Sequence, residues 1–199
     1  MTPAVLAASV AWAAAMAYLV RLPLAPGDRA KAPAFGPLFC AIAAATCLPF
    51  ICRTPSEAAG RAATLGMLVA TGAVDYRTGY IFDFATLPSA AISLAVAVAT
   101  GSVSPAAHAL FSIGVPIGAL AAWSRGTWIA WGDIKAIFSI VIAFGVTESL
   151  LTLIVASLSG ILHARALGAR SIPFGPHMAL GAAIAVAVGP LLDPILMEG

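Results

Sequence analysis

The sequence predicts an all-α, polytopic membrane protein, a transmembrane helical bundle of about eight spans. Of its 199 residues, 61% are hydrophobic and only 9% are charged, whereas a soluble domain usually carries about 25% charged residues. The mean hydropathy is +1.02. Apolar runs about as long as a membrane is thick recur along the chain, and they are continuous rather than alternating, which favours helices over strands.

Glycine, proline and charged residues separate the predicted spans from one another. The first run follows Met1 without a basic stretch before it or a clear small-residue cleavage site after it, so we interpret it as a retained helix and not as a signal peptide. The absence of an internal repeat or a low-complexity linker indicates a single domain over residues 1–199. The predicted spans cover about 3–20, 34–51, 60–76, 84–101, 105–122, 134–146, 148–164 and 176–196.

The basic residues are distributed unequally between the two sides of this bundle. Arg53 and Arg61 fall on one side, and the other eight of the ten Lys and Arg residues fall in or beside the connections of the opposite side. Cytoplasmic loops of membrane proteins carry an excess of Lys and Arg, so the richer side is predicted to be cytoplasmic and both termini to lie outside. The cytoplasmic connections are 21–33, 77–83, 123–133 and 165–175.

Several classes of site are not favoured by this composition. The three cysteines lie in or at the end of one apolar segment without C-x-x-C spacing, and the three histidines are scattered, so we predict no metal site and no cofactor. The basic residues are too thinly spread to favour nucleic acid as a partner. Trp123, Trp128 and Trp131 are interpreted as an aromatic belt at the lipid boundary, and Glu148 is assigned to an outer turn without a function.

Two polar islands interrupt the apolar pattern, AVDYRTGYIFD at residues 73–83 and WIAWGDIKAIF at residues 128–138. They place Asp75 and Asp133 at the predicted cytoplasmic boundary. A carboxylate near lipid costs a few kcal/mol and needs a partner, water or a function. A purely structural explanation is open for each aspartate, as the partner of the basic residue two positions further on.

A second explanation is that the two aspartates meet. Two carboxyl groups that share a site do not both ionise readily, so one keeps a proton while the other is charged. Such a pair can activate a water molecule and protonate an amide leaving group, as in aspartic proteases. A proton relay or a transporter needs the same residues, so the pair alone does not decide between an enzyme and a transport protein.

Three motifs in order resemble those of the type IV prepilin peptidases, which are membrane aspartic peptidases. WGDIK at 131–135 is similar to the family's G-x-G-D motif followed by a hydrophobic residue and lysine. VDYRTGYIFD at 74–83 resembles its first aspartate motif, and IPFGPHMALGA at 172–182 resembles the entry to its last helix. The motif-bearing part is therefore about 73–182, within a single integral membrane peptidase domain.

The resemblance implies roles for five residues. Asp75 and Asp133 would be the catalytic dyad, one as base and the other as acid, and Asp83 would support the loop. Gly132 would let the backbone approach a neighbour beside Asp133. Lys135 would either keep the local field positive or mark the cytoplasmic boundary, and we favour the boundary role.

The sequence departs from the family pattern at three places. AYLVRLPLAP at 17–26 is similar to the end of the first helix of the bifunctional family members, but the insert with two C-x-x-C pairs that follows there is missing. The resemblance therefore implies a peptidase without N-methyltransferase activity. Ala130 replaces the first glycine of G-x-G-D, and Phe82 replaces a proline that would fix a turn.

The expected function is that of an aspartic endopeptidase of the inner (cytoplasmic) membrane with its active site facing the cytoplasm. By resemblance, it would remove the basic leader from a pilin-like or pseudopilin precursor of a type IV pilus or type II secretion system. Its predicted partners are this precursor and the lipid bilayer. The alternative is a non-cleaving transporter or assembly factor that uses the same aspartates to handle protons.

Overall fold

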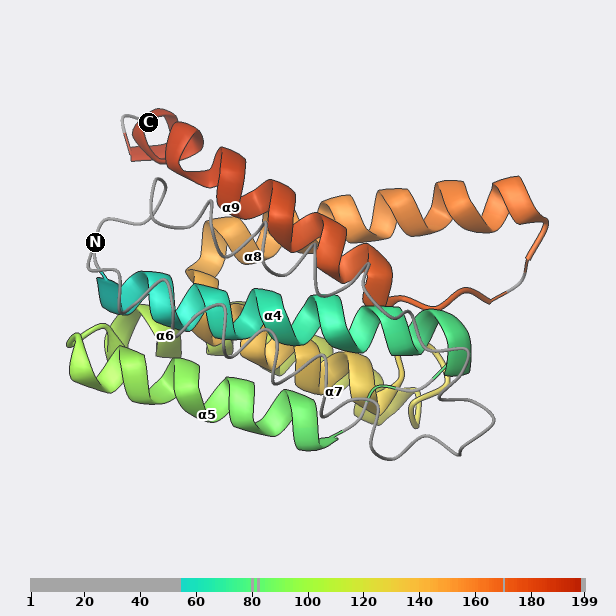
Figure 1. Cartoon of the computed structure of the whole chain (residues 1–199), viewed down its shortest axis with the longest axis horizontal. Coiled ribbons are helices and arrows are strands. Elements are labelled where there is room, and N and C mark those ends of the chain that lie inside the picture. Colours follow the sequence, from blue (N-terminus) through green and yellow to red (C-terminus); the bar gives the residue numbers. More distant parts are fainter. Residues whose placement is uncertain (1–54, 80, 82, 170, 198–199) are drawn as a thin grey trace.

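The computed structural model describes residues 55–197, apart from 80, 82 and 170, and this part is helical without strands. The predicted all-α class is confirmed for these residues (Figure 1). The predicted spans 3–20 and 34–51 lie outside the described residues, so the count of eight stays a prediction. Two of the described stretches, Val103–Trp123 and Trp131–Leu167, are long and apolar enough to cross a membrane.

Two neighbouring helices form one side of the bundle. Helix α4 (Pro55–Thr78) is rich in alanine and glycine and runs beside α5 (Asp83–Ala99), whose first turn carries the acidic residue favoured at a helix N-terminus. Between them, the hydroxyl groups of Thr64 and Ser93 are hydrogen-bonded at 3.1 Å, both side chains being buried. In an apolar bundle such a polar contact links neighbouring helices.

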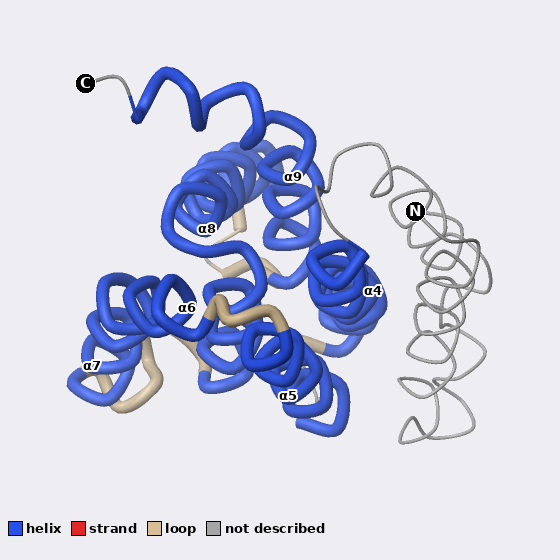
Figure 2. Tube along the Cα trace, turned by 90° about the vertical axis from the view of Figure 1, so that its left-hand side faces the viewer, coloured by secondary structure: helices blue, strands red, loops and turns tan. Residues whose placement is uncertain are grey.

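A continuous helical segment lies on the side of the bundle away from α4 (Figure 2). It consists of α6 (Val103–Ala109), the π-helical turn η1 (Leu110–Gly114) and α7 (Val115–Trp123). These three pieces follow one another without a break and together correspond to the predicted span 105–122. A tight turn with positive φ at Arg125 and Gly126 then leads to the next helix.

Helix α8 (Trp131–Leu167) is two helices joined at Gly145. Gly145 has φ 74° and ψ −167°, a conformation essentially restricted to glycine, and Figure 1 shows that the chain reverses its direction here. The hydroxyl of Ser149 contacts the carbonyl of Ile140 at 3.5 Å, a distance that a straight helix does not allow for residues nine positions apart. The predicted boundary between spans 134–146 and 148–164 therefore coincides with a real reversal.

Helix α9 (Gly175–Met197) packs against α8 and α4 and closes the bundle (Figures 1 and 2). The core between these helices consists of small and branched apolar side chains, such as Leu68, Ile140 and Met178, all of which are fully buried. As a result, the end of α4, the start of α8 and the start of α9 lie together at one end of the bundle.

Candidate active site

The two predicted catalytic aspartates line the same pocket. Asp75 belongs to the last turn of α4 and Asp133 to the first turn of α8, and both face a pocket of about 1040 Å³. The two side chains are close enough to interact electrostatically. The fold therefore brings together the two carboxylates that the sequence singled out, whereas their catalytic role stays a prediction.

Asp75 is held in place by the start of α9. Its side chain is buried, and its Oδ2 atom accepts a hydrogen bond of 2.7 Å from the backbone N–H of Gly175. A Cβ atom on Gly175 would lie 2.9 Å from that same Oδ2 and 3.0 Å from the Cα of Gly72. Only glycine allows this approach of two backbones and a carboxylate, so the IPFGP segment contributes directly to the pocket.

Asp133 is placed by the N-terminus of α8. Ala130 is the N-cap residue, and its backbone group lies near the Asp133 carboxylate three positions later. A carboxylate three positions after the N-cap is common at the first turn of a helix, where a negative charge is favoured. Ala130 has φ −68° and is exposed. Its methyl group is therefore accommodated where the family pattern has a glycine.

Gly132 makes a close approach beside Asp133. A Cβ atom at this position would lie 2.9 Å from the Cβ atom of Ile81, in the segment that precedes α5. The packing predicted for Gly132 is therefore present, and it joins the first aspartate motif to the second. Phe82, the second departure from the family pattern, lies outside the described residues.

Lys135 and Asp83 form an ion pair between the first turns of α8 and α5. The Nζ atom of Lys135 lies 2.5 Å from Oδ1 of Asp83, and the two side chains are 35% and 59% exposed. Lys135 therefore pairs with Asp83, and not with Asp133 as the structural explanation of the sequence supposed. An exposed pair of this kind contributes at most about 1 kcal/mol, so it positions the loop more than it stabilises the fold.

The rest of the pocket wall combines apolar and polar residues, and some of it was not expected from the sequence. Trp128, interpreted as part of an aromatic belt, lines the pocket and is 70% exposed. Tyr76, next to Asp75, also faces it. The remaining apolar wall consists of Ile81, Ile117, Ile129, Ile137, Leu153, Ile172 and Phe174.

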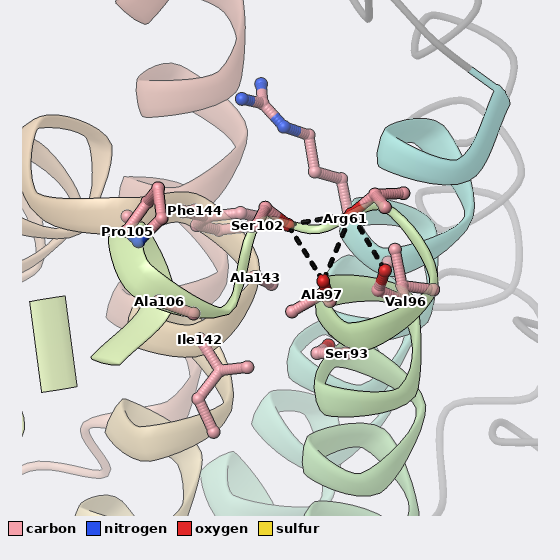
Figure 3. A pocket seen from close by; sticks show the side chains of 13 residues that line it. Arg61, Ser93, Val96, Ala97, Ser102, Pro105, Ala106, Ile142, Ala143 and Phe144 are labelled. Carbon is pink, nitrogen blue, oxygen red and sulfur yellow. Dashed lines mark hydrogen bonds between the residues drawn. The ribbon is translucent and has the colours of Figure 1, made fainter. Parts of the chain in front are cut away.

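A second cavity of about 360 Å³ lies at the other end of the bundle (Figure 3). It is lined by parts of α4, α5, α6 and α8, including Arg61, Ser93 and Phe144, and none of the predicted site residues reaches it. Within the described ranges there is no group of three or more His, Cys, Asp or Glu side chains that could hold a metal ion.

Comparison with known families agrees with the motifs. The model of the type IV leader peptidase family matches residues 62–164, slightly more than half of the chain. The chain belongs to this family. The matched range contains Asp75 and Asp133, whereas Gly175 lies beyond it. No curated protein and no solved structure matches the chain.

The type IV leader peptidase family consists of membrane-associated peptidases that act on prepilin-type leaders. The pocket is therefore considered as the site of a peptidase. The pocket of this type IV leader peptidase has two carboxylates, one of them fixed by a backbone N–H, in a wall that combines apolar side chains with Tyr76, Thr127, Ser157 and Ser171.

Proposed function

We propose that the protein is an aspartic endopeptidase that removes the basic leader from pilin-like or pseudopilin precursors at the cytoplasmic face of the inner membrane. The observation that supports this most directly is that Asp75 and Asp133 line one pocket of a chain that belongs to the type IV leader peptidase family. In the proposed reaction, the attacking water molecule is held between these two carboxylates.

The proposed reaction needs two proton transfers. One carboxylate accepts a proton from the water molecule, whose oxygen then forms a bond to the carbonyl carbon of the scissile amide. The other carboxyl group donates its proton to the amide nitrogen, and the C–N bond breaks to give a new carboxyl terminus and a new amino terminus. The N–H of Gly175 keeps Asp75 in a fixed orientation while its charge changes.

The apolar wall supports a substrate that brings its own hydrophobic helix. Trp128, Ile129 and Phe174 line the pocket around the carboxylates, and such side chains contact an apolar segment better than a basic leader. We therefore propose that the hydrophobic helix of the precursor is recognised by this wall, and that the scissile bond just before it lies at the carboxylates.

The test of this function is a cleavage assay with purified full-length protein in lipid. Several prepilin-like precursors with a basic leader are incubated with the protein and S-adenosylmethionine, and the products are identified by intact mass. We expect one cut at the leader junction and no added methyl group. The control is a double variant, Asp75→Asn with Asp133→Asn, which should leave every precursor intact.

If the well-folded protein leaves all precursors intact, the proposed peptidase is wrong and the non-cleaving transporter or assembly factor is favoured. Proton-coupled flux of a solute into vesicles that contain the protein would then support the transporter. A product with a mass increase of one methyl group would contradict the predicted lack of N-methyltransferase activity.

Replacing Gly175 by alanine is expected to reduce the kcat of cleavage by about 10- to 100-fold, because displacing a reacting group by about 1 Å has effects of this size. The new methyl group would lie 2.9 Å from the Asp75 carboxylate and push it out of place. The measurement is kcat and KM for one precursor. Gly60→Ala is the matched control, because its Cβ atom would lie 3.5 Å from the nearest atom, an ordinary contact. Equal activity of the two variants would show that the Gly175 contact does not matter.

A further inference from the structure

A cluster of hydrogen-bonded side chains joins α8 and α9 beside the pocket. His177, in the first turn of α9, uses both of its ring nitrogens. Its Nδ1 atom lies 2.9 Å from Oγ of Ser159, and its Nε2 atom lies 3.1 Å from Nδ1 of His163. Ser159 and His163 are four positions apart on α8 and so share one face of that helix. His177 is almost completely buried, at 9% exposure.

The number of protons on the two histidines decides whether the hydrogen bonds of this cluster can form. The hydroxyl of Ser159 also lies within hydrogen-bond distance of the Ala156 carbonyl, at 3.1 Å. With both histidines neutral, His163 can donate to His177, His177 to Ser159, and Ser159 to that carbonyl, so every contact contains one proton. The same hydrogen bonds can also form when one of the two histidines is protonated, because the other ring then accepts at their contact. With both rings protonated, two N–H groups would face each other at 3.1 Å, and the contact between the histidines would be lost.

The cluster is linked to Asp75 by two routes, through Gly175 of α9 and through Tyr76 of α4. His177 lies two positions after Gly175, within the same helical turn, and Gly175 donates to the Asp75 carboxylate. On the other side, the ring of Tyr76, the neighbour of Asp75 in α4, stacks on His163 with centroids 6.4 Å apart and planes inclined by 14°. Among the described residues, the titratable groups linked to the histidine pair are Tyr76, which stacks on His163, and Asp75, which is reached through Gly175.

From these contacts we infer that His177 and His163 are positioning residues for Asp75: the pair fixes the first turn of α9, keeps the Gly175 N–H on the carboxylate, and releases it when both rings are protonated. This inference rests on the proposed peptidase. It adds a second acid-sensitive element to the aspartates themselves. Neither ring lines the pocket, so neither acts on the substrate.

The kinetic test uses variants that separate hydrogen bonding from protonation. His177→Leu removes both contacts, and we expect kcat to fall by roughly 10-fold with KM nearly unchanged. His163→Gln can still donate to His177 but takes up no proton, so kcat should be retained at neutral pH and the loss of activity in acid should move to lower pH. The matched control is His108→Gln, because His108 is exposed on α6. An acid limb that is identical in wild type and His163→Gln would overturn the inference.

A second measurement does not depend on cleavage. In protein labelled with nitrogen-15 glycine, the amide resonance of Gly175 reports its hydrogen bond to Asp75. We expect this resonance to move as the second histidine is protonated in wild type, and to stay in place over the same pH range in His163→Gln. A Gly175 resonance that ignores the histidine titration in wild type would contradict the inference even if precursors are cleaved. If the resonance moves but the protein cleaves no precursor, the link between the histidines and the Gly175 hydrogen bond is supported and the proposed peptidase is wrong.

Discussion

Asparagine in place of either Asp75 or Asp133 is expected to reduce the kcat of leader cleavage by about 10²- to 10⁴-fold, because a group that transfers a proton in the transition state contributes this much. Asparagine has nearly the same size as aspartate. Its side-chain oxygen can still accept the hydrogen bond from Gly175, so the fold should be retained. What it cannot do is take up or release a proton at the working pH.

The measurement is single-turnover cleavage of one precursor, with thermal unfolding of each variant as the check on folding. Asp83→Asn is the matched control, because Asp83 is an aspartate at the same end of the bundle but is exposed and paired with Lys135. Its activity should stay within a few-fold of wild type. Substantial cleavage by Asp75→Asn or Asp133→Asn would remove the dyad from the mechanism, whatever the result for Asp83.

The parts of the fold that could be predicted are those that depend on local sequence. Apolar runs between glycine and proline residues predicted the helices of the described part, and the reversal at Gly145 lies one residue before the predicted end of the span 134–146. The pairing of Asp75 with Asp133 on one side followed from counting spans and basic residues. These inferences use only the length, hydropathy and charge of consecutive residues.

The parts that could not be predicted depend on contacts between distant segments. The Gly175 amide and the Asp75 carboxylate are 100 positions apart, and nothing in either local sequence indicates the hydrogen bond. His163 and His177 looked scattered because periodicity places residues on one helix and does not align two helices. The IPFGP segment was the one available signal for Gly175, and its value rested on resemblance alone.

Glu148 is the position where the interpretation of the sequence was wrong. It was assigned to an outer turn without a function, at the junction of the predicted spans 134–146 and 148–164. In the structure it is 4% exposed, and it pairs with Arg61 of α4 at 2.9 Å. Gly189 of α9 packs on it so closely that a Cβ atom there would lie 2.7 Å from the Glu148 side chain. Three helices therefore meet at this carboxylate.

Removing one partner of this ion pair is expected to destabilise the protein by about 3–5 kcal/mol, because breaking a buried ion pair leaves the other charge without this partner. Glu148→Gln and Arg61→Met should each lower Tm by roughly 10 °C. The measurement is thermal unfolding in detergent, followed by circular dichroism. The double variant Arg61→Met with Glu148→Met should recover much of the lost stability, since buried ion pairs can be replaced by apolar side chains.

The position of the pair separates stability from catalysis. Arg61 and Asp75 are both on α4, about 21 Å apart along a straight helix, so cleavage measured well below Tm should be nearly unchanged in Glu148→Gln. Such a variant would show that the end of the bundle beside the reversal at Gly145 holds the helices together, while the other end carries the chemistry. A loss of kcat at unchanged Tm would instead mean that Glu148 influences the carboxylates through the helices. A Tm that is unchanged in both single variants would mean that water compensates the remaining charge.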